Sequence, residues 1–531
     1  MLYTVRSTRG MATSPHRLAT EAGLRVLREG GTAVEATIAM GACLAVVYPH
    51  MTAIGGDGFW LISKDGQVPV AIDACGAAAA KATEELYRSN GLSAVPWRGP
   101  LAANTVAGAV SGWGEALRLS NELGGRLPLS RLVEDAVFHG ESGFPVTASQ
   151  EETTAEKLSQ LADAPGFAPV YLDRGHALAE GSLMRLPALA RTLKRIGAQG
   201  ADDFYRGALA RDIAADLSRI GSPVSAADLN GHHAQRRPPL SVPIRGARLF
   251  NFPPPTQGVA SLMILALFDR LRVAEAEGFA HIHGLVEATK QAFLVRDAHV
   301  GDPAAMTRDP AEFLTAGFLD KLAARIDPAR ALPWPQPASA GDTVWLGAID
   351  RNGIAASYIQ SIYFEYGSGC VLEDTGIVWQ NRGASLLIGE NANPVRRLRP
   401  GAKPFHTLNP AMALFDDGRT MVYGTMGGEG QPQTQAALFS RYAMFGQGLQ
   451  EAITAPRWLL GKTWGEDSVS LKLESRFDPA LCDALRAAGH NVEMVPAYSS
   501  VMGHAGAVVR RADGVYEGAS DPRSDGAALG F

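Results

Sequence analysis

The stretch Gly341-Asp-Thr-Val-Trp-Leu-Gly-Ala-Ile349, the turn Asp350-Arg-Asn-Gly353 and the run Ile354-Ala-Ala-Ser-Tyr-Ile-Gln-Ser-Ile362 decide how this chain folds. Two runs rich in β-branched and aromatic residues on either side of a tight turn predict a pair of antiparallel strands. The Pro-rich segment Ala331-Leu-Pro-Trp-Pro-Gln-Pro-Ala-Ser-Ala-Gly341 lies directly before them. We therefore expect a boundary there, with Thr343 opening a β-rich part of the chain.

The sequence on either side of this hairpin predicts an α+β protein. Apolar periodicity favours helices through most of residues 105–330, including Leu129 to His139 and Phe279 to His299. Further elements are expected near both ends of the chain: two helices within Pro15 to Tyr48, separated by Gly30-Gly31 with Thr32 as N-cap; a hairpin over Gly58 to Ile72 with an Asp65-Gly66 turn; and strands over Ser500 to Arg511 and Gly514 to Gly518.

Composition and charge exclude several classes of function. The 531 residues are 46% hydrophobic and 19% charged, which excludes bulk disorder, and the net charge is −5. Without a basic field, neither nucleic acid nor an anionic membrane is expected as the main partner. The N-terminus lacks a secretory pattern and the apolar run Ala36 to Tyr48 is too short to span a bilayer, so a cytoplasmic protein is expected.

Metal, disulfide and nucleotide motifs are missing from the sequence. The patterns GxSxG, HExxH and GxxxxGK[ST] are absent, and the glycines of Gly55-Gly-Asp-Gly58 do not match a dinucleotide fingerprint. We predict no metal and no other cofactor. Side chains that could bind metal do gather in His281, His283, Glu287, Asp297, His299 and Asp302, but with no standard spacing, and Cys43, Cys75, Cys370 and Cys482 form no CxxC pair.

Thr343 is the strongest candidate for a catalytic residue in the sequence. A threonine at a strand start is ordinarily a β-former and nothing more. If the bond between Asp342 and Thr343 were cut, however, Thr343 would carry a hydroxyl nucleophile and an α-amine, whose pKa near 7.7–8.0 suits a general base. Gly427-Gly428 could offer two backbone N–H groups to an oxyanion, or form a simple turn.

These features together resemble the γ-glutamyltransferase family of N-terminal nucleophile hydrolases. The resemblance implies a four-layer αββα sandwich with extra helices and a precursor that cuts itself before Thr343, giving a large subunit of residues 1–342 and a small subunit of 343–531. The stretches that carry it are Gly30-Gly-Thr-Ala-Val-Glu-Ala36, Pro49-His-Met-Thr-Ala-Ile-Gly-Gly-Asp-Gly-Phe59, Asp342-Thr343, Phe364-Glu-Tyr-Gly-Ser-Gly369, Gly424-Thr-Met-Gly-Gly428 and Asp521-Pro-Arg-Ser-Asp-Gly-Ala-Ala-Leu-Gly530.

The resemblance also implies roles for individual residues. Thr343 matches the nucleophile, Gly427 and Gly428 match the oxyanion hole, and Ser361 keeps a hydroxyl near the nucleophile. Arg98 stands where the family binds a substrate carboxylate, as an arginine fork can do. The implied catalytic machinery therefore needs the two subunits and no cofactor.

Departures from the family pattern bear on the substrate. The residues that hold a glutamyl α-ammonium are replaced by Tyr363 and Ser385, the paired serines become His406-Thr407, and a cation, Arg382, appears nearby. We therefore expect Arg98, Arg382, Tyr363, His406 and Thr407 to bind a small amide that bears a carboxylate.

The segments Gly341-Asp-Thr-Val-Trp345 and Gln380-Asn-Arg-Gly383 resemble the branch that includes oxamate amidohydrolase, which implies conversion of oxamate to oxalate and ammonia in purine-derived nitrogen metabolism. The alternatives are a γ-glutamyl hydrolase or transferase, a β-lactam side-chain acylase, and an uncleaved binding protein. The two subunits could also pair into a dimer of such units.

Overall fold

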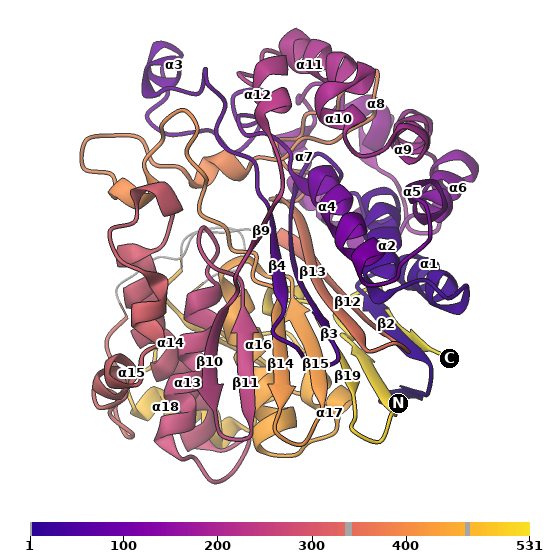
Figure 1. The fold of residues 1–531 in the computed structure, drawn as a ribbon. Helices are drawn as coiled ribbons and strands as arrows, with labels where there is room; N and C mark the ends of the chain where they lie inside the picture. The colour runs from indigo at the N-terminus through magenta and orange to yellow at the C-terminus, as the bar shows by residue number, and fades with distance from the viewer. Residues whose placement is uncertain (1–2, 335–341, 462–467) are drawn as a thin grey trace.

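A computed structural model describes residues 3–334, 342–461 and 468–531. Two seven-stranded antiparallel sheets lie face to face, and helices cover the outer face of each, as Figure 1 shows. This is the expected four-layer αββα sandwich. The first sheet runs in the order β21 (Ala527–Gly530), β2 (Gly10–Ser14), β12 (Asp342–Asp350), β13 (Ile354–Tyr363), β3 (Asp57–Lys64), β4 (Val70–Ala74) and β9 (Gln235–Arg237).

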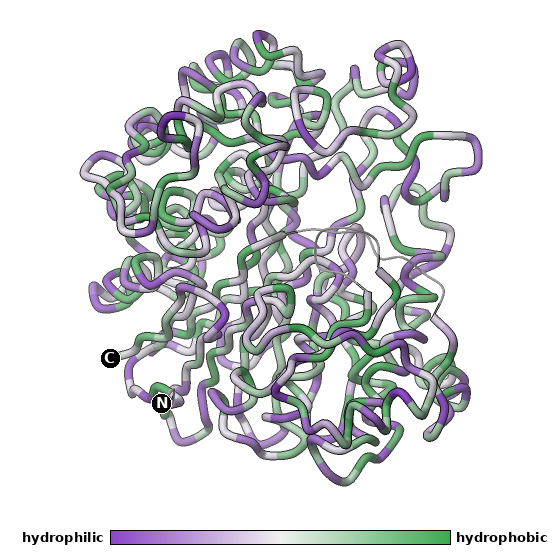
Figure 2. Tube along the Cα trace, turned by 180° about the vertical axis from the view of Figure 1, so that it is seen from behind, coloured by the Kyte–Doolittle hydropathy of each residue, from purple (hydrophilic) through white to green (hydrophobic). Residues whose placement is uncertain are grey.

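The second sheet contains strands from both ends of the chain. Its order is β1 (Val5–Ser7), β20 (Tyr516–Ser520), β19 (Ala505–Arg510), β15 (Thr420–Thr425), β14 (Ala411–Phe415), β11 (Ala247–Asn251) and β10 (Leu240–Ile244). The two termini lie close together at one edge of the sandwich in both Figure 1 and Figure 2. Because each sheet takes strands from before and after residue 342, the boundary at the Pro-rich segment does not separate two folding units.

Helices α1 (Arg17–Arg28), α2 (Ala33–Val47) and α4 (Ala109–Glu122) cover the first sheet, and α13 (Gly258–Leu271), α14 (Phe279–His299) and α16 (Gln431–Phe439) cover the second. The remaining helices are α3 (Glu84–Ser89), α5 (Leu129–Leu132), α6 (Glu134–Ser142), α7 (Ala148–Leu161), α8 (Phe167–Tyr171), α9 (Pro187–Gln199), α10 (Asp203–Arg206), α11 (Ala208–Ile220), α12 (Ala226–Gly231), α15 (Ala316–Ala323), α17 (Leu449–Thr454) and α18 (Pro479–Ala487). Three small sheets pair β5 (Phe144–Pro145) with β8 (Leu183–Met184), β6 (Leu172–Asp173) with β7 (His176–Ala177), and β16 (Trp458–Leu460) and β18 (Val492–Val495) with β17 (Leu471–Glu474).

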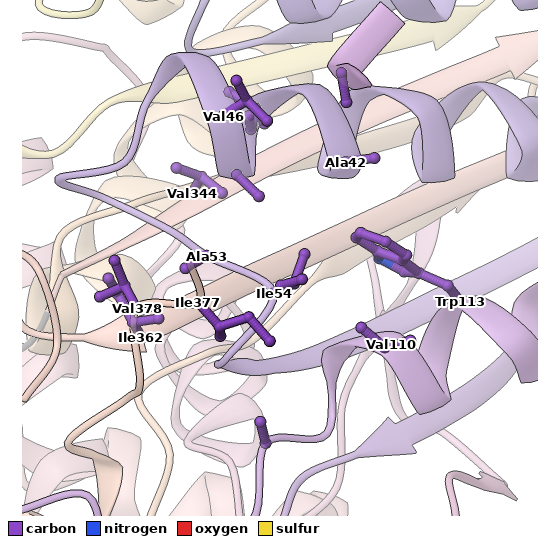
Figure 3. Close-up of a cluster of buried hydrophobic side chains, with 14 of the residues drawn as sticks. Ala42, Val46, Ala53, Ile54, Val110, Trp113, Val344, Ile362, Ile377 and Val378 are labelled. Atoms are coloured by element: carbon purple, nitrogen blue, oxygen red, sulfur yellow. The ribbon is translucent and has the colours of Figure 1, made fainter. Parts of the chain in front are cut away.

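The hydrophobic core follows the layers. One buried cluster lies between the first sheet and its helices, a second between the other sheet and its helices, and a third between the two sheets. Figure 3 shows part of the first cluster, where Val344 and Ile362 lie in one group with Val46 of α2 and Val110 and Trp113 of α4. These clusters determine which side chains of β12 and β13 point toward the helices and which point toward the other sheet.

Most of the expected elements are present. Thr32 caps α2 in a capping box with Glu35, because each side chain bonds the other residue's backbone N–H. The hairpin of β3 and β4 turns at Asp65 and Gly66, whose φ angles are +51° and +71°, as a type I′ turn requires. Strands β12 and β13 follow the expected hairpin at residues 350–353.

Three expectations need correction. The helix expected over Leu129 to His139 is two helices, α5 and α6, which meet at Val133. Strands β9, β10 and β11 interrupt the middle of the chain, where helices were expected to dominate. The strand expected from Ser500 begins only at Ala505, because Gly503, with φ +81°, ends a 3₁₀ turn between them. Residues 335–341 of the Pro-rich segment, where a boundary was expected, lie outside the described residues.

Candidate active site

Thr343 lies at the start of β12, fully buried. Along β12, Val344 belongs to the helix-side cluster and Trp345 to the cluster between the sheets. Strand alternation therefore directs Thr343 toward the space between the sheets. Its neighbour across the ladder is Ser361, whose Oγ accepts hydrogen bonds from Thr343 Oγ1 at 3.3 Å and from the backbone N–H of Tyr363 at 2.8 Å.

A β-bulge marks the point where Thr343 lies. Asp342 pairs with Tyr363 and Val344 pairs with Gln360, so β13 has one residue more than β12 between these pairs. Tyr363 has a φ of +83°, a left-handed conformation that is costly for a bulky side chain. The backbone of β13 is thus irregular directly opposite the expected cleavage site.

Gly427 and Gly428 follow β15 of the second sheet, with φ angles of +120° and +51°. The packing between the sheets shows which end of β12 they approach. A Cβ on Gly347 would lie 3.1 Å from Val422, and one on Gly424 would lie 2.2 Å from Trp345. Position 347 of β12 thus packs on position 422 of β15, and position 345 packs on position 424. The next pair in this series is position 343 with position 426, so the two glycines lie at the same end of the sandwich as Thr343.

A buried brace holds this glycine turn. Gln257 Nε2 donates to the carbonyl oxygens of Gly428 at 2.8 Å and Thr407 at 2.7 Å. Gln257 Oε1 accepts from Arg296 Nη1 at 2.9 Å, and Arg296 Nη2 pairs with Glu429 at 2.6 Å. Sequence reasoning missed Gln257 and Arg296, since neither belongs to a motif and they lie far from the glycines along the chain.

Arg382 supplies a buried positive charge. Its side chain is 1% exposed, its Cζ lies 3.8 Å from the centre of the Tyr363 ring, and Nη1 lies 3.5 Å from Thr407 Oγ1. Nη2 is buried without a hydrogen-bond partner in the part of the chain that the structure describes. Burial lowers the pKa of Arg382 to about 10, so the guanidinium stays charged at neutral pH. A buried cation with an unused donor is suited to bind an anion.

Asp57, Cys75 and His406 form a buried polar cluster beside Arg382. His406 Nε2 lies 3.0 Å from Cys75 Sγ and 3.2 Å from Asp57 Oδ2. Burial raises the pKa of Asp57 to about 7, although backbone N–H groups of Gly76 and Gly108 and the charge of Arg382 oppose it. Burial also holds the pKa of His406 well below its ordinary value. Their ligand atoms lie within 4.8 Å of one another, so these side chains could hold a metal ion.

The expected substrate-binding residues thus differ in their surroundings. Arg382 contacts the side chains of both Tyr363 and Thr407, whereas His406 faces the Asp57–Cys75 cluster. Ser385 donates its hydroxyl to the backbone oxygens of Arg382 at 3.0 Å and Phe405 at 3.1 Å, which orients the short helix that carries Arg382.

Arg98 lies against the segment that follows β13. Its Nη1 donates to the backbone oxygens of Glu365 at 2.6 Å and Gly367 at 2.5 Å, and Nη2 lies 3.7 Å from the Glu365 carboxylate. Trp97, next to it, is 6.2 Å from the Tyr363 ring between centroids. The role of Arg98 in binding a substrate carboxylate stays a prediction.

A buried threonine at a strand start inside an αββα sandwich, at the end where a glycine turn lies, is typical of amide hydrolases of the N-terminal nucleophile class. The family model described as Gamma-glutamyltranspeptidase matches residues 19–531, and the chain belongs to this family. It is 53% identical over 526 residues to the oxamate amidohydrolase proenzyme of Klebsiella pneumoniae subsp. pneumoniae, covering 99% of both chains. It is 39% identical to the glutathione hydrolase-like YwrD proenzyme of Bacillus subtilis, over the full length of both.

Solved structures agree with this assignment. The crystal structure of cephalosporin acylase from Bacillus halodurans matches with a TM-score of 0.91 at 28% identity, covering 100% of this chain and 97% of that one. The chain is therefore a hydrolase that acts on amide C–N bonds, an amidohydrolase made as a precursor of two subunits. Among the described residues, no helix has both the length and the apolar character needed to span a membrane.

Proposed function

We propose that this chain is a self-cleaving threonine amidohydrolase that converts oxamate to oxalate and ammonia. The observation that carries the proposal is the burial of Arg382, whose Nη2 has no hydrogen-bond partner among the described residues. A small bound anion would accept a hydrogen bond from this nitrogen and balance the buried positive charge. The similarity to the Klebsiella oxamate amidohydrolase proenzyme supports the same substrate.

Self-cleavage would proceed at the bulge between β12 and β13. The Thr343 hydroxyl attacks the carbonyl carbon of Asp342, the C–N bond between them breaks, and the acyl group moves from nitrogen to oxygen. Water then hydrolyses the ester, which leaves a carboxylate on Asp342 and a free α-amine on Thr343. The irregular pairing at this point, with Tyr363 in a left-handed conformation opposite Asp342, is the local feature that supports cleavage at this bond.

Substrate hydrolysis would use the same hydroxyl. The substrate carboxylate binds Arg382, and the α-amine of Thr343 takes the hydroxyl proton as Oγ1 attacks the amide carbon. The N–H groups of Gly427 and Gly428 stabilise the oxyanion. The intermediate collapses, the α-ammonium returns its proton to the departing nitrogen, and ammonia leaves. Water, deprotonated by the α-amine, hydrolyses the threonyl ester and releases oxalate.

The other site residues would position these groups. Ser361 binds the Thr343 hydroxyl, and Gln257 holds the carbonyl of Gly428, so that the backbone N–H groups of the turn keep their direction. Thr407 and Tyr363 flank the guanidinium of Arg382. Arg98 is kept as a second contact for the carboxylate, and His406 as a neighbour of the anion site.

A γ-glutamyl substrate is the second candidate, and the relative described as glutathione hydrolase-like supports it. Among the described residues, the counterpart of the α-ammonium aspartate is Ser385, whose hydroxyl is engaged with two backbone oxygens. A neutral hydroxyl compensates an ammonium less well than a carboxylate does, which favours oxamate.

The experiment is intact-mass analysis of the purified wild type and of Thr343→Ala, followed by an ammonia-release screen over small amides. We expect the wild type to give chains of residues 1–342 and 343–531 and to release ammonia from oxamate. The variant should remain a single inactive chain. A variant that still splits at this bond would mean that another protease makes the cut.

A further inference from the structure

Helix α14 carries a cluster of buried polar side chains that the proposed reaction does not use. His283 and Glu287 of α14 lie with His490, and their ligand atoms are within 4.8 Å of one another. Lys290 lies one helical turn after Glu287 on the same helix. His490 follows α18, in the predicted small subunit, whereas α14 belongs to the predicted large subunit. The cluster therefore joins the two expected products of self-cleavage.

The charged pair of this cluster holds the backbone of Leu332. Lys290 Nζ lies 2.7 Å from Glu287 Oε1, and both side chains are 2% exposed. The remaining groups of the pair bind the same residue from both sides: Lys290 Nζ donates to the Leu332 carbonyl at 2.6 Å, and the Leu332 N–H donates to Glu287 Oε2 at 3.0 Å.

The histidines and the end of α18 hold the chain just before Leu332. His283 Nδ1 lies 2.9 Å from His490 Nε2, and its Nε2 donates to the carbonyl of Asp327 at 2.8 Å. The N–H of Ala331 donates to the carbonyl of Ala488 at 2.8 Å. Burial lowers the pKa of His490 to about 3, which keeps its ring neutral and able to share one proton with His283.

These contacts explain the side chains better than a metal site does. Both carboxylate oxygens of Glu287 are engaged, one by the ammonium of Lys290 and one by a backbone N–H. The ammonium already supplies the positive charge that a metal would bring. In addition, the His283 nitrogen that faces away from His490 is bound to a backbone carbonyl.

We propose that His283, Glu287, Lys290 and His490 form a clamp that fastens residues 327–332 of the large subunit to the small subunit, both before and after the chain is cut at residue 343. The proposal rests on the self-cleavage proposed above. Leu332 is ten residues before Asp342, a span of at most about 36 Å in an extended chain. Once the bond is cut, the clamp holds the segment that leads to the new chain end, together with the Trp334 ring that packs beside Phe293. A chain end with fewer attachments frays more readily.

Limited trypsin digestion tests the clamp, because the exposed Arg330 lies within the clamped segment, directly before the bound Ala331 and Leu332. The variant Lys290→Met removes the ammonium and keeps the chain length. A double variant, Glu287→Gln with Lys290→Met, avoids an uncompensated buried carboxylate if the single variant folds poorly. Lys321→Met, at an exposed lysine of α15, is the matched control.

We expect cleavage after Arg330, read as a shortened large subunit by mass, to be at least about tenfold faster in the clamp variants than in the wild type and the control, because local opening becomes easier. Equal rates in all four proteins would overturn the clamp, as would protection that depends on added Zn²⁺ and is lost with a chelator. The digestion needs no substrate, and it can be repeated in the uncut Thr343→Ala chain. Failure of the clamp is therefore distinguishable from failure of the proposed activity.

Discussion

Replacing Arg382 by methionine should remove most of the affinity for a carboxylate-bearing amide. The guanidinium is fully buried, and Nη2 has no hydrogen-bond partner within the described residues, so an incoming carboxylate meets a desolvated cation. A charge-assisted hydrogen-bonded contact of this kind contributes about 2–3 kcal/mol, which corresponds to roughly 30–150-fold in KM. Methionine retains most of the side-chain volume, which limits the effect on packing.

The assay is steady-state ammonia release from oxamate and from oxamide, a neutral diamide of the same size. We expect Arg382→Met to raise KM for oxamate by the stated factor and to leave KM for oxamide within about threefold. Arg382→Lys should fall between, because it keeps the charge and loses the planar fork. Gel analysis of self-cleavage and a thermal melt control for folding. If KM rises equally for both amides, Arg382 does not bind the carboxylate and the anion-site argument is wrong.

Four further predictions address the remaining parts of the site. Gly428→Pro deletes an N–H at a position with φ +51°, which proline cannot adopt, and should lower kcat by at least about 10²–10³-fold; a folded and cleaved variant with normal kcat would remove Gly428 from the oxyanion hole. Gln257→Leu should lower kcat about tenfold or more at nearly constant KM, because the carbonyl of Gly428 loses its donor; a change confined to KM would contradict this role. Arg98→Ala should raise KM for oxamate roughly 30–150-fold if it contacts the carboxylate, whereas a lower Tm with unchanged KM would limit it to holding residues 365 and 367. Burial penalises the charged form of Asp57 and raises its pKa from 3.8 to about 7, so the wild type is most stable below pH 4 and loses stability as pH rises through 7. The Tm of Asp57→Asn relative to the wild type should therefore increase from pH 5 to pH 8, and a constant difference would show that Asp57 is not buried as a titrating group.

Local patterns were enough to predict much of the scaffold. The strands on either side of residues 350–353 and the capping box at Thr32 depend on residues that are close in sequence, so propensity and turn chemistry determine them. Strands β10 and β11 were missed because they form a hairpin within a mostly helical part of the chain, and β14, through which β11 joins the sheet, lies more than 150 residues away. Their pairing is a tertiary effect that overrides local periodicity.

The site was predictable only in part. Thr343 and the glycine pair were found because each stands in a short recognisable motif. The Asp57–Cys75–His406 cluster and the bond from Gln257 to Gly428 join residues between about 20 and 350 positions apart, and no spacing rule connects them. Arg382 was expected near the substrate, but its burial and its unused Nη2 emerge only from the packing around it.

The comparison of kcat/KM for oxamate and for a γ-glutamyl anilide, measured side by side on the self-cleaved wild type, tests the central claim most directly. A site with Arg382 for a carboxylate, and with Ser385 in place of an aspartate for an ammonium, predicts that oxamate has the higher kcat/KM. A higher kcat/KM for the anilide would contradict the account and make this chain a γ-glutamyl hydrolase.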